Sequence, residues 1–423
     1  MNTVSGRFSG LNITPMQFQR YLLVGLIGLY MLYPRHLPWI SVTLHGSLLA
    51  LISLVYIIAH RGFIDTRLAL PYLLFLIPLI LSMLFSCGSF NAIYLRFYIS
   101  SGIASYLTAF YFHKPNSLDS LLFVVYFILF SAVLTALQLF SDLLPSLSWV
   151  EHSQTLLGWG KSGDPILYGM FLIFGTIFFV VLYCNGRKKY VLLLLQIMMV
   201  AIVVNASRAV WIGTLAGVLT LAFLRGETKL CVLLLMMFGL AFSGVRAIGA
   251  VIPSLVASSS SKPRSELMYK TNPKYFMREL SQEASKRGRY GILLTGLRMW
   301  RQYPLLGVGP GNFEKKSTEF AVPEQLSKQV RDEDYFDPQN IYLAILSESG
   351  TLGFVGFLGM LSLVILRFFK QFTHSKGKHR LRLAGIFSFF MGLSVVGLAH
   401  DVHLDRLYWI ALGFLNGAGA YHD

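Results

Sequence analysis

Long apolar stretches recur along nearly the whole chain and alternate with short clusters of polar and charged residues. A helix needs about 20 apolar residues to cross a hydrocarbon core of about 30 Å. The pattern therefore predicts an all-α integral membrane protein with about twelve transmembrane helices. The expected spans are residues 20–33, 37–59, 69–86, 90–112, 119–144, 165–184, 190–206, 208–224, 229–251, 341–368, 381–399 and 404–421.

The short loops predict the orientation of these spans. Loops with several Lys and Arg residues alternate with loops that have few, and such basic loops concentrate in the cytoplasm. Both termini are then expected to be cytoplasmic. Residues 1–19 are polar and lack the apolar core of a cleaved signal peptide, so we expect the first span to direct insertion.

The longest polar segment then lies on the periplasmic side. We expect a cytoplasmic tail at 1–19, spans 1 to 9 within 20–252, a large periplasmic loop with short helices at 253–340, and spans 10 to 12 within 341–423. Residues 262–301 hold ten basic and three acidic side chains, whereas 302–340 hold four basic and seven acidic ones. This polarity suits a site that binds an anionic donor beside a carbohydrate acceptor.

Composition supports a membrane protein and argues against other classes. The chain is 55% hydrophobic and 13% charged, whereas soluble domains have about 25% charged residues. The net charge of +16 comes mainly from short interhelical clusters, so topology explains it better than nucleic-acid binding does. The three cysteines form no CxxC pair and indicate neither a disulfide framework nor a metal site.

Arginines in two places are candidate anion contacts. Arg208 stands alone between two apolar runs, where a charge is costly unless it snorkels, pairs or lines a polar cavity. Its guanidinium suits a diphosphate, and interfacial anchoring beside Trp211 is the alternative. Arg298 and Arg301 lie among apolar residues at helical spacing, which predicts a helix at the outer interface. That helix either only seeks the surface or presents Arg298 to an anionic lipid headgroup.

Residues 304–313 are rich in glycine but do not form a nucleotide-binding motif. They lack the Lys-Ser/Thr of a P-loop and follow no strand of a βαβ unit. Tight backbone turns are the expected use of these glycines.

The end of the long loop contains further candidates. Asp337, Gln339 and Asn340 precede the next span, which contains Tyr342 and Glu348. In a continuous helix Glu348 would lie about two turns deeper than Asn340, on a similar face. An intramembrane carboxylate is a functional candidate by default, and pairing with an arginine such as Arg96 or Arg246 is the alternative.

Two histidines and two aspartates lie within residues 400–405 and superficially resemble a metal cluster. The signal is weak, and a solvated loop is the favoured interpretation.

The motifs in order resemble the O-antigen ligase and polymerase family. They read Ser-Arg-Ala-Val-Trp at 207–211, Gly-Leu-Arg-Met-Trp at 296–300, the glycine-rich segment at 304–313, Asn-Ile-Tyr-Leu at 340–343 and Glu-Ser-Gly-Thr-Leu-Gly at 348–353. The resemblance covers about residues 205–358, and the order of all the motifs is more specific than any one of them.

The resemblance implies a glycosyltransferase of the bacterial inner membrane with a periplasmic site. Its donor would be a glycan on undecaprenyl diphosphate, and its acceptor lipid A-core for a ligase of lipopolysaccharide assembly or a carrier-linked repeat unit for a polymerase. By position, Arg208 and Arg298 match the family arginines that hold the diphosphate, and Arg301 and Tyr342 are further candidate substrate contacts. No nucleotide, metal or other cofactor is implied. Membrane lipids and polysaccharide-assembly proteins are the other expected partners.

One position departs from the family pattern. The family has His before the loop-end Asn, whereas this chain has Gln339. An amide cannot accept a proton near neutral pH and can only orient a hydroxyl. Either Asp337, Glu348 or His403 is the base, or departure of the diphosphate needs little base help, or activity is lost. The change weakens the ligase interpretation slightly more than the polymerase one.

Two other functions stay open from the sequence. Many transporters have about twelve spans, but the chain shows no convincing half-to-half repeat. A non-catalytic assembly partner is the second alternative, and Gln339 makes it more credible.

Overall fold

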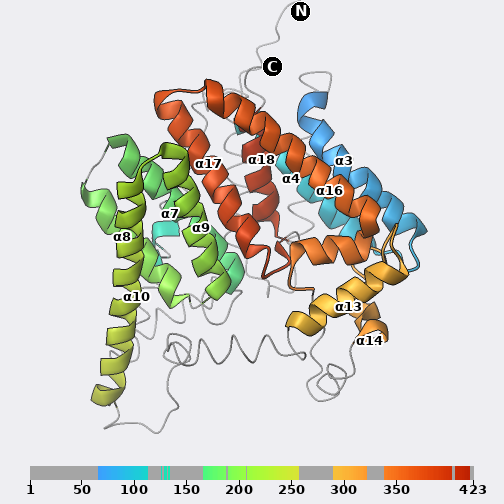
Figure 1. The fold of residues 1–423 in the computed structure, drawn as a ribbon, viewed down its shortest axis with the longest axis horizontal. Helices are drawn as coiled ribbons and strands as arrows, with labels where there is room; N and C mark the ends of the chain where they lie inside the picture. Colours follow the sequence, from blue (N-terminus) through green and yellow to red (C-terminus); the bar gives the residue numbers. More distant parts are fainter. Residues whose placement is uncertain are drawn as a thin grey trace, which may run out of the picture.

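The computed structural model describes residues 65–112, 125, 128–130, 132–133, 165–186, 189–205, 207–256, 289–321, 338–402 and 405–419. All regular secondary structure within these residues is helical (Figure 1). The helices are α3 (Thr66–Phe85), α4 (Ala92–Phe112), α7 (Pro165–Gly186), α8 (Lys189–Val204), α9 (Arg208–Arg225), α10 (Thr228–Val256), α13 (Arg289–Gln302), α14 (Phe313–Phe320), α16 (Ile341–His374), α17 (Gly377–Val396) and α18 (Arg406–Gly419).

The described helices agree with a multi-pass membrane protein. Six of them are long and apolar enough to cross a membrane, namely α3, α7, α9, α10, α16 and α17. Helices coincide with the predicted spans 69–86 and 90–112, with the four spans from 165–184 to 229–251, and with the three from 341–368 to 404–421, although several boundaries differ. Spans 20–33 and 37–59 lie outside the described residues, and 119–144 is described at a few helical positions. The total of about twelve spans stays a prediction.

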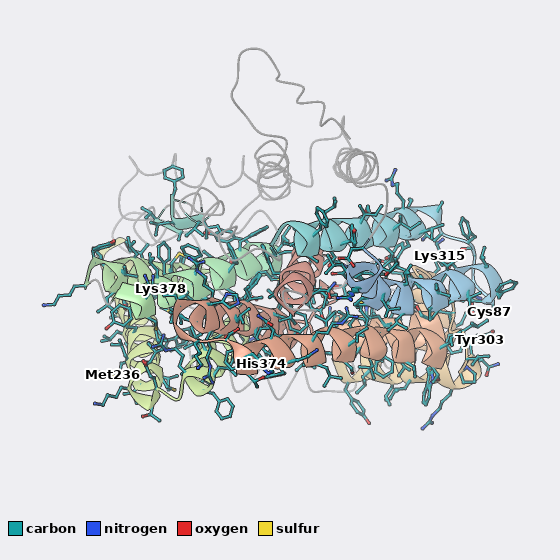
Figure 2. All side chains as sticks on the ribbon, turned by 90° about the horizontal axis from the view of Figure 1, so that it is seen from above. Cys87, Met236, Tyr303, Lys315, His374 and Lys378 are labelled. Atoms are coloured by element: carbon teal, nitrogen blue, oxygen red, sulfur yellow. The ribbon has the colours of Figure 1, made fainter. Side chains whose placement is uncertain are left out.

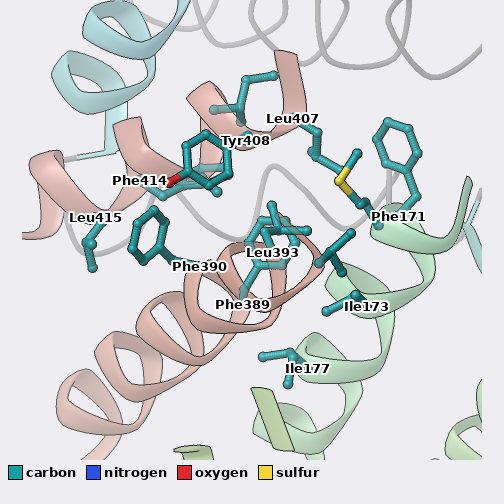
Figure 3. Packing of buried hydrophobic residues seen from close by; sticks show 14 of the residues in the cluster. Phe171, Ile173, Ile177, Phe389, Phe390, Leu393, Leu407, Tyr408, Phe414 and Leu415 are labelled. Carbon is teal, nitrogen blue, oxygen red and sulfur yellow. The ribbon is translucent and has the colours of Figure 1, made fainter. Parts of the chain in front are cut away.

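The helices form two groups joined by α17 (Figure 1). In one group α16 packs on α3, and α18 packs on α4 and α16. In the other, α7 to α10 pack on one another, and α17 packs on both α9 and α7. Figure 3 shows the junction, where Phe389, Phe390 and Leu393 of α17 lie between Tyr408 of α18 and Ile173 of α7. The two groups therefore share one apolar core.

Small residues allow close contact between the paired helices. A Cβ atom on Gly413 of α18 would lie 2.4 Å from the Ser105 carbonyl oxygen of α4, and one on Gly217 of α9 would lie 2.8 Å from the Ser388 oxygen of α17. Small residues of this kind let membrane helices approach each other closely.

Two prolines inside α3 are accommodated by α16. Pro71 has no N–H to donate to the Arg67 carbonyl, and Arg367 Nη1 donates to that carbonyl instead, at 2.6 Å. Pro78 likewise frees the Leu74 carbonyl, which lies so close to Gly356 that a Cβ atom there would be 2.5 Å from the oxygen. A neighbouring helix thus provides the donor for the carbonyl that Pro71 leaves free.

This arrangement predicts a specific coupling between Pro71 and Arg367. Arg367→Met removes the substitute donor and should lower the stability of the protein by about 1 kcal/mol, or Tm by about 2 °C. In a Pro71→Ala background the helix regains its own N–H donor, so the same substitution should cost clearly less. Thermal unfolding of the four proteins checks this, and an equal cost in both backgrounds would show that the bond is irrelevant.

The two ends of the helix bundle differ. We call the end of the bundle with α13 and α14 the loop end, and α9 also begins there with Arg208 (Figure 1). We call the opposite end, where α16 ends at His374 and α17 begins at Gly377, the basic end. At the loop end α10 continues to Val256, so the predicted start of the long loop at 253 lies within a helix.

Candidate functional site

The loop end contains a small second core that joins α13 and α14 to α16. Met299 of α13, Val308 and Phe313 pack with Leu343 at the start of α16. The start of α16 is a short segment, because Gly350 interrupts the helix with φ 64° and ψ −168°. This first part lies across the end of the bundle, and the remainder runs along α3 (Figure 1).

The glycine-rich segment pairs with the interruption of α16 through its backbone. Val308 and Gly309 donate to the carbonyls of Ser347 and Glu348, at 3.0 and 2.7 Å. In return, Thr351 and Leu352 donate to the carbonyls of Pro304 and Leu305, at 2.8 and 3.1 Å. We call this junction of residues 304–309 with 347–352 the seam.

Glycine is required at two facing positions of the seam. A Cβ atom on Gly307 would lie 2.4 Å from the Glu348 carbonyl carbon and oxygen, and one on Gly350 would lie 2.4 Å from the Leu305 carbonyl. Both glycines also have positive φ, 67° and 64°. The expected role in tight backbone turns is confirmed, and the seam joins segments about forty residues apart in the sequence.

Glu348 lies inside the seam, with a side chain that is 4% exposed. Its Oε1 accepts from the Phe313 backbone N–H, at 3.2 Å, where α14 begins. The first N–H groups of a helix have no partner within the helix, so a carboxylate there satisfies one and complements the helix dipole. The helix is continuous from its N-cap Asn340 to Glu348, as expected, but Gly350 divides the expected span 341–368 directly after this carboxylate.

Two serines outside the predicted motifs, Ser82 of α3 and Ser89 after it, bond to the seam and to Asn312 just beyond it. The Ser82 hydroxyl donates to the carbonyls of Leu306 and Glu348, at 2.6 and 3.2 Å. The buried Asn312 amide donates to the Ser89 carbonyl at 2.9 Å, and its oxygen accepts from the Ser89 hydroxyl at 2.9 Å. Neither serine was predicted from the sequence, whereas Asn312 lies within the glycine-rich motif.

Asn340 is the N-cap of α16. Its Oδ1 accepts from the backbone N–H groups of Tyr342 and Leu343, at 2.9 and 3.0 Å. Its Nδ2 donates to the Leu398 carbonyl at 2.9 Å, beside a bond from the Ile341 N–H to the Gly397 carbonyl. Asn340 therefore fixes the end of the long loop to the turn that follows α17.

The cap predicts the effect of two substitutions. Asn340→Ala should destabilise the protein by about 1–2 kcal/mol because it removes both interactions. Asn340→Asp keeps the acceptor for the helix N–H groups but loses the donor to Leu398, so it should cost less than alanine. Thermal unfolding of both variants checks the order, and a harmless alanine would contradict the capping role.

Gln339 has an unusual backbone conformation. Among the described residues, Gln339 is the only non-glycine residue with a positive φ, which is 47°. This left-handed region is several-fold enriched in Asn, Asp and His, and a non-glycine residue there costs about 1–2 kcal/mol. The half-buried Gln339 thus lies at a strained position directly before the cap, where the family pattern has His.

Arg298 connects α13 to the end of α14. Its Nη1 donates to the carbonyls of Phe320 and Ala321, at 3.2 and 3.3 Å, and the side chain is exposed. Both bonds come from Nη1 and fix the guanidinium against the end of α14. Arg301, one turn further, is exposed as well. The neighbouring Trp300 donates from its indole nitrogen to the Thr351 hydroxyl at 3.0 Å and so ties α13 to the seam.

Arg208 is the first residue of α9 and is half-buried. Trp211 is buried, and its indole nitrogen donates to the Ile202 carbonyl of α8 at 2.8 Å. The Trp211 indole therefore closes the turn between α8 and α9, and the two expected roles of Arg208 stay predictions.

The candidates separate into three sets. Gln339, Asn340, Tyr342 and Glu348 lie together at the first part of α16, and the Tyr342 ring packs 6.2 Å from that of Phe357. Arg298 and Arg301 lie on α13, which packs on α16, whereas Arg208 lies on α9, which packs on α17, α7 and α10. Asp337 and His403 lie outside the described residues.

Two titratable groups at the loop end have raised pKa values. The Glu319 carboxylate accepts from Lys316 Nζ at 2.9 Å and raises the pKa of the Lys316 ammonium. A hydrogen bond with Cys87 raises the pKa of the Tyr303 hydroxyl. Figure 2 shows Cys87, Tyr303 and Lys315 at the same side of the molecule. Within the described residues, no group of three His, Cys, Asp or Glu is placed to hold a metal.

Comparison with protein families identifies this region. Residues 193–358 match the family model described as O-antigen ligase. This part of the chain belongs to the O-antigen ligase family. A search of curated proteins finds no match to the chain.

The O-antigen ligase domain runs from α8 to the middle of α16. It therefore includes Arg208, the arginines of α13, the seam, Asn340 and Glu348. Several groups that hold it in place lie outside the matched range, namely Ser82, Ser89 and the carbonyls of Gly397 and Leu398. The domain thus depends on α3 and α17 for its geometry.

Proposed function

We propose that this protein is a glycosyltransferase of the bacterial inner membrane that takes a glycan from undecaprenyl diphosphate. The acceptor is a carrier-linked repeat unit or lipid A-core, with the first preferred because the family His is absent. The observation that carries the proposal is the O-antigen ligase match over residues 193–358, which includes both candidate arginine positions and the seam. The loop end would face the periplasm.

The chemistry requires a cation near the leaving group. An acceptor hydroxyl attacks the anomeric carbon, the bond from that carbon to the diphosphate oxygen breaks, and the diphosphate leaves with the electron pair. Fixed donors aimed at the developing charge stabilise the transition state, and removal of one costs about 10²–10³-fold in rate. Arg298 supports this role because its exposed guanidinium is already oriented by two carbonyls.

A group other than the Gln339 amide must take the proton from the acceptor hydroxyl. Glu348 is buried and already accepts from the Phe313 N–H, which favours a positioning role for its carboxylate. Asp337 and His403 are then the candidate bases. The Gln339 amide would orient the acceptor hydroxyl.

The proposal is tested by expressing the protein in a bacterial strain from which its gene has been deleted. The wild-type protein should restore the surface polysaccharide, whereas Arg208→Ala and Arg298→Ala should leave it absent and let the lipid-linked precursor accumulate. Lys315→Ala is the matched control, because this exposed cation of α14 bonds only weakly to Ser89, at 3.3 Å. Full restoration by both arginine variants, at equal amounts in the membrane, would refute the proposal.

A further inference from the structure

The basic end of the bundle has an apolar cleft between α7 and α17. Aromatic and aliphatic side chains line it, and its polar residues are Asn185, Lys378 and Arg382. The apolar lining includes Phe174, Ile177, Phe178, Val181, Ile386 and Phe389. The cleft lies between two helices that are long and apolar enough to cross a membrane.

A second, more polar cleft adjoins the first. Asn185, Lys378 and Leu381 line both, so the two clefts meet at these residues. Arg225 and Arg380 add two further cations there. Arg225 pairs with the Glu227 carboxylate, and Arg380 lies 4.8 Å from the Phe372 ring centroid. The combined cleft thus has an apolar interior and a strongly cationic mouth.

The start of α17 adds to the attraction for an anion. Its N-cap is Lys376, whose side chain makes no capping hydrogen bond and has no acceptor for the first N–H groups of the helix. The N-terminus of a helix favours an anion through these N–H groups and the helix dipole. Lys378, exposed in this first turn, lies at the surface (Figure 2).

We propose that this combined cleft binds an anionic phospholipid. An acyl chain lies in the apolar part between α7 and α17, and the phosphate lies between Lys378 and Arg382 near the start of α17. Basic pockets between membrane helices on the cytoplasmic side suit anionic headgroups. The site is separate from the candidate glycan site, because α13 and α14 lie at the other end of the bundle. It does not depend on the proposed glycosyltransferase activity.

Because α17 packs on α9, whose first residue is Arg208, a lipid at the basic end would also stabilise the helix pair that holds this arginine. We therefore expect the lipid to raise the thermal stability of the whole protein.

Lipid titration of the purified full chain tests the site. In detergent, added phosphatidylglycerol should raise Tm more than phosphatidylcholine of the same chain length, and native mass spectrometry should show retained phosphatidylglycerol. The double variant Lys378→Gln/Arg382→Gln should bind phosphatidylglycerol about 25-fold more weakly. The control Lys189→Gln/Lys229→Gln removes the same charge from exposed residues that line neither cleft, and it should bind as the wild type does.

Two further measurements separate a lipid from a bare anion. Ile386→Trp fills the apolar cleft and keeps every cation, so it should also lose the preference for phosphatidylglycerol. Inorganic phosphate alone should not reproduce the rise in Tm. The proposal is overturned if the wild type shows no preference for phosphatidylglycerol, if both double variants respond alike, if Ile386→Trp keeps the preference, or if phosphate alone is sufficient.

Discussion

Gly307→Ala is expected to open the seam and to abolish glycan transfer. The added Cβ atom would lie 2.4 Å from the backbone of Glu348, which cannot move without breaking the hydrogen bonds of Val308 and Gly309. The positive φ of 67° adds about 1–2 kcal/mol of strain. Together we expect a loss of about 3 kcal/mol or more in stability. Thermal unfolding and a transfer assay on the same preparation measure both effects.

Gly226→Ala is the matched control for this prediction. Gly226 also has φ 67°, but an added Cβ atom there would meet nothing within 4 Å. It should show the conformational strain alone, about 1 kcal/mol, and keep its activity. Equal losses in the two variants would mean that close approach across the seam is unimportant.

Glu348→Ala is expected to have the second largest effect. It leaves the Phe313 N–H without its acceptor in a buried place and removes the carboxylate from the start of α14, so stability should fall by about 2–3 kcal/mol. The change should also release α14, whose last carbonyl groups hold Arg298. Glycan transfer should therefore fall steeply, with a parallel fall in Tm.

Glu348→Gln separates a positioning role from a base. The amide oxygen can still accept from the Phe313 N–H, so a positioning residue predicts substantial remaining activity and a Tm close to that of the wild type. If Glu348 is the general base, the Glu348→Gln variant should be as inactive as Glu348→Ala although its Tm is near normal. Adding Asp337→Asn tests the other carboxylate, and wild-type activity of the double variant would exclude both as bases.

Local patterns in the sequence predicted most of the described helices, but not α14 or the break in α16. Apolar runs of span length located α3, α7 and α17, and the Asn-x-Tyr-Leu motif marked the start of α16, where Asn is a favoured N-cap. The order of motifs also located the O-antigen ligase domain. These features depend on residues close together in the chain, so the sequence contains them directly.

The geometry of the site depends on distant contacts and could not be predicted in the same way. The break at Gly350 looks like one more glycine in an apolar run, and it becomes evident only when residues 304–309 pair with it. The left-handed backbone of Gln339 and the bonds from Arg298 to the end of α14 likewise have no local signal. The sequence alone suggested that Glu348 is a carboxylate within a span, whereas the structure shows it as an acceptor for the first N–H of α14, inside the seam.

Transfer by the purified protein tests the central claim most directly. The full chain in lipid nanodiscs is given a glycan on undecaprenyl diphosphate and a carrier-linked repeat unit, and the release of undecaprenyl diphosphate is measured with the extended glycan. The wild type and Lys315→Ala should release both products, and Arg298→Ala and Arg208→Ala should be about 10²–10³-fold slower at equal amounts of folded protein. Wild-type rates in both arginine variants, or no release by the wild type, would contradict the account.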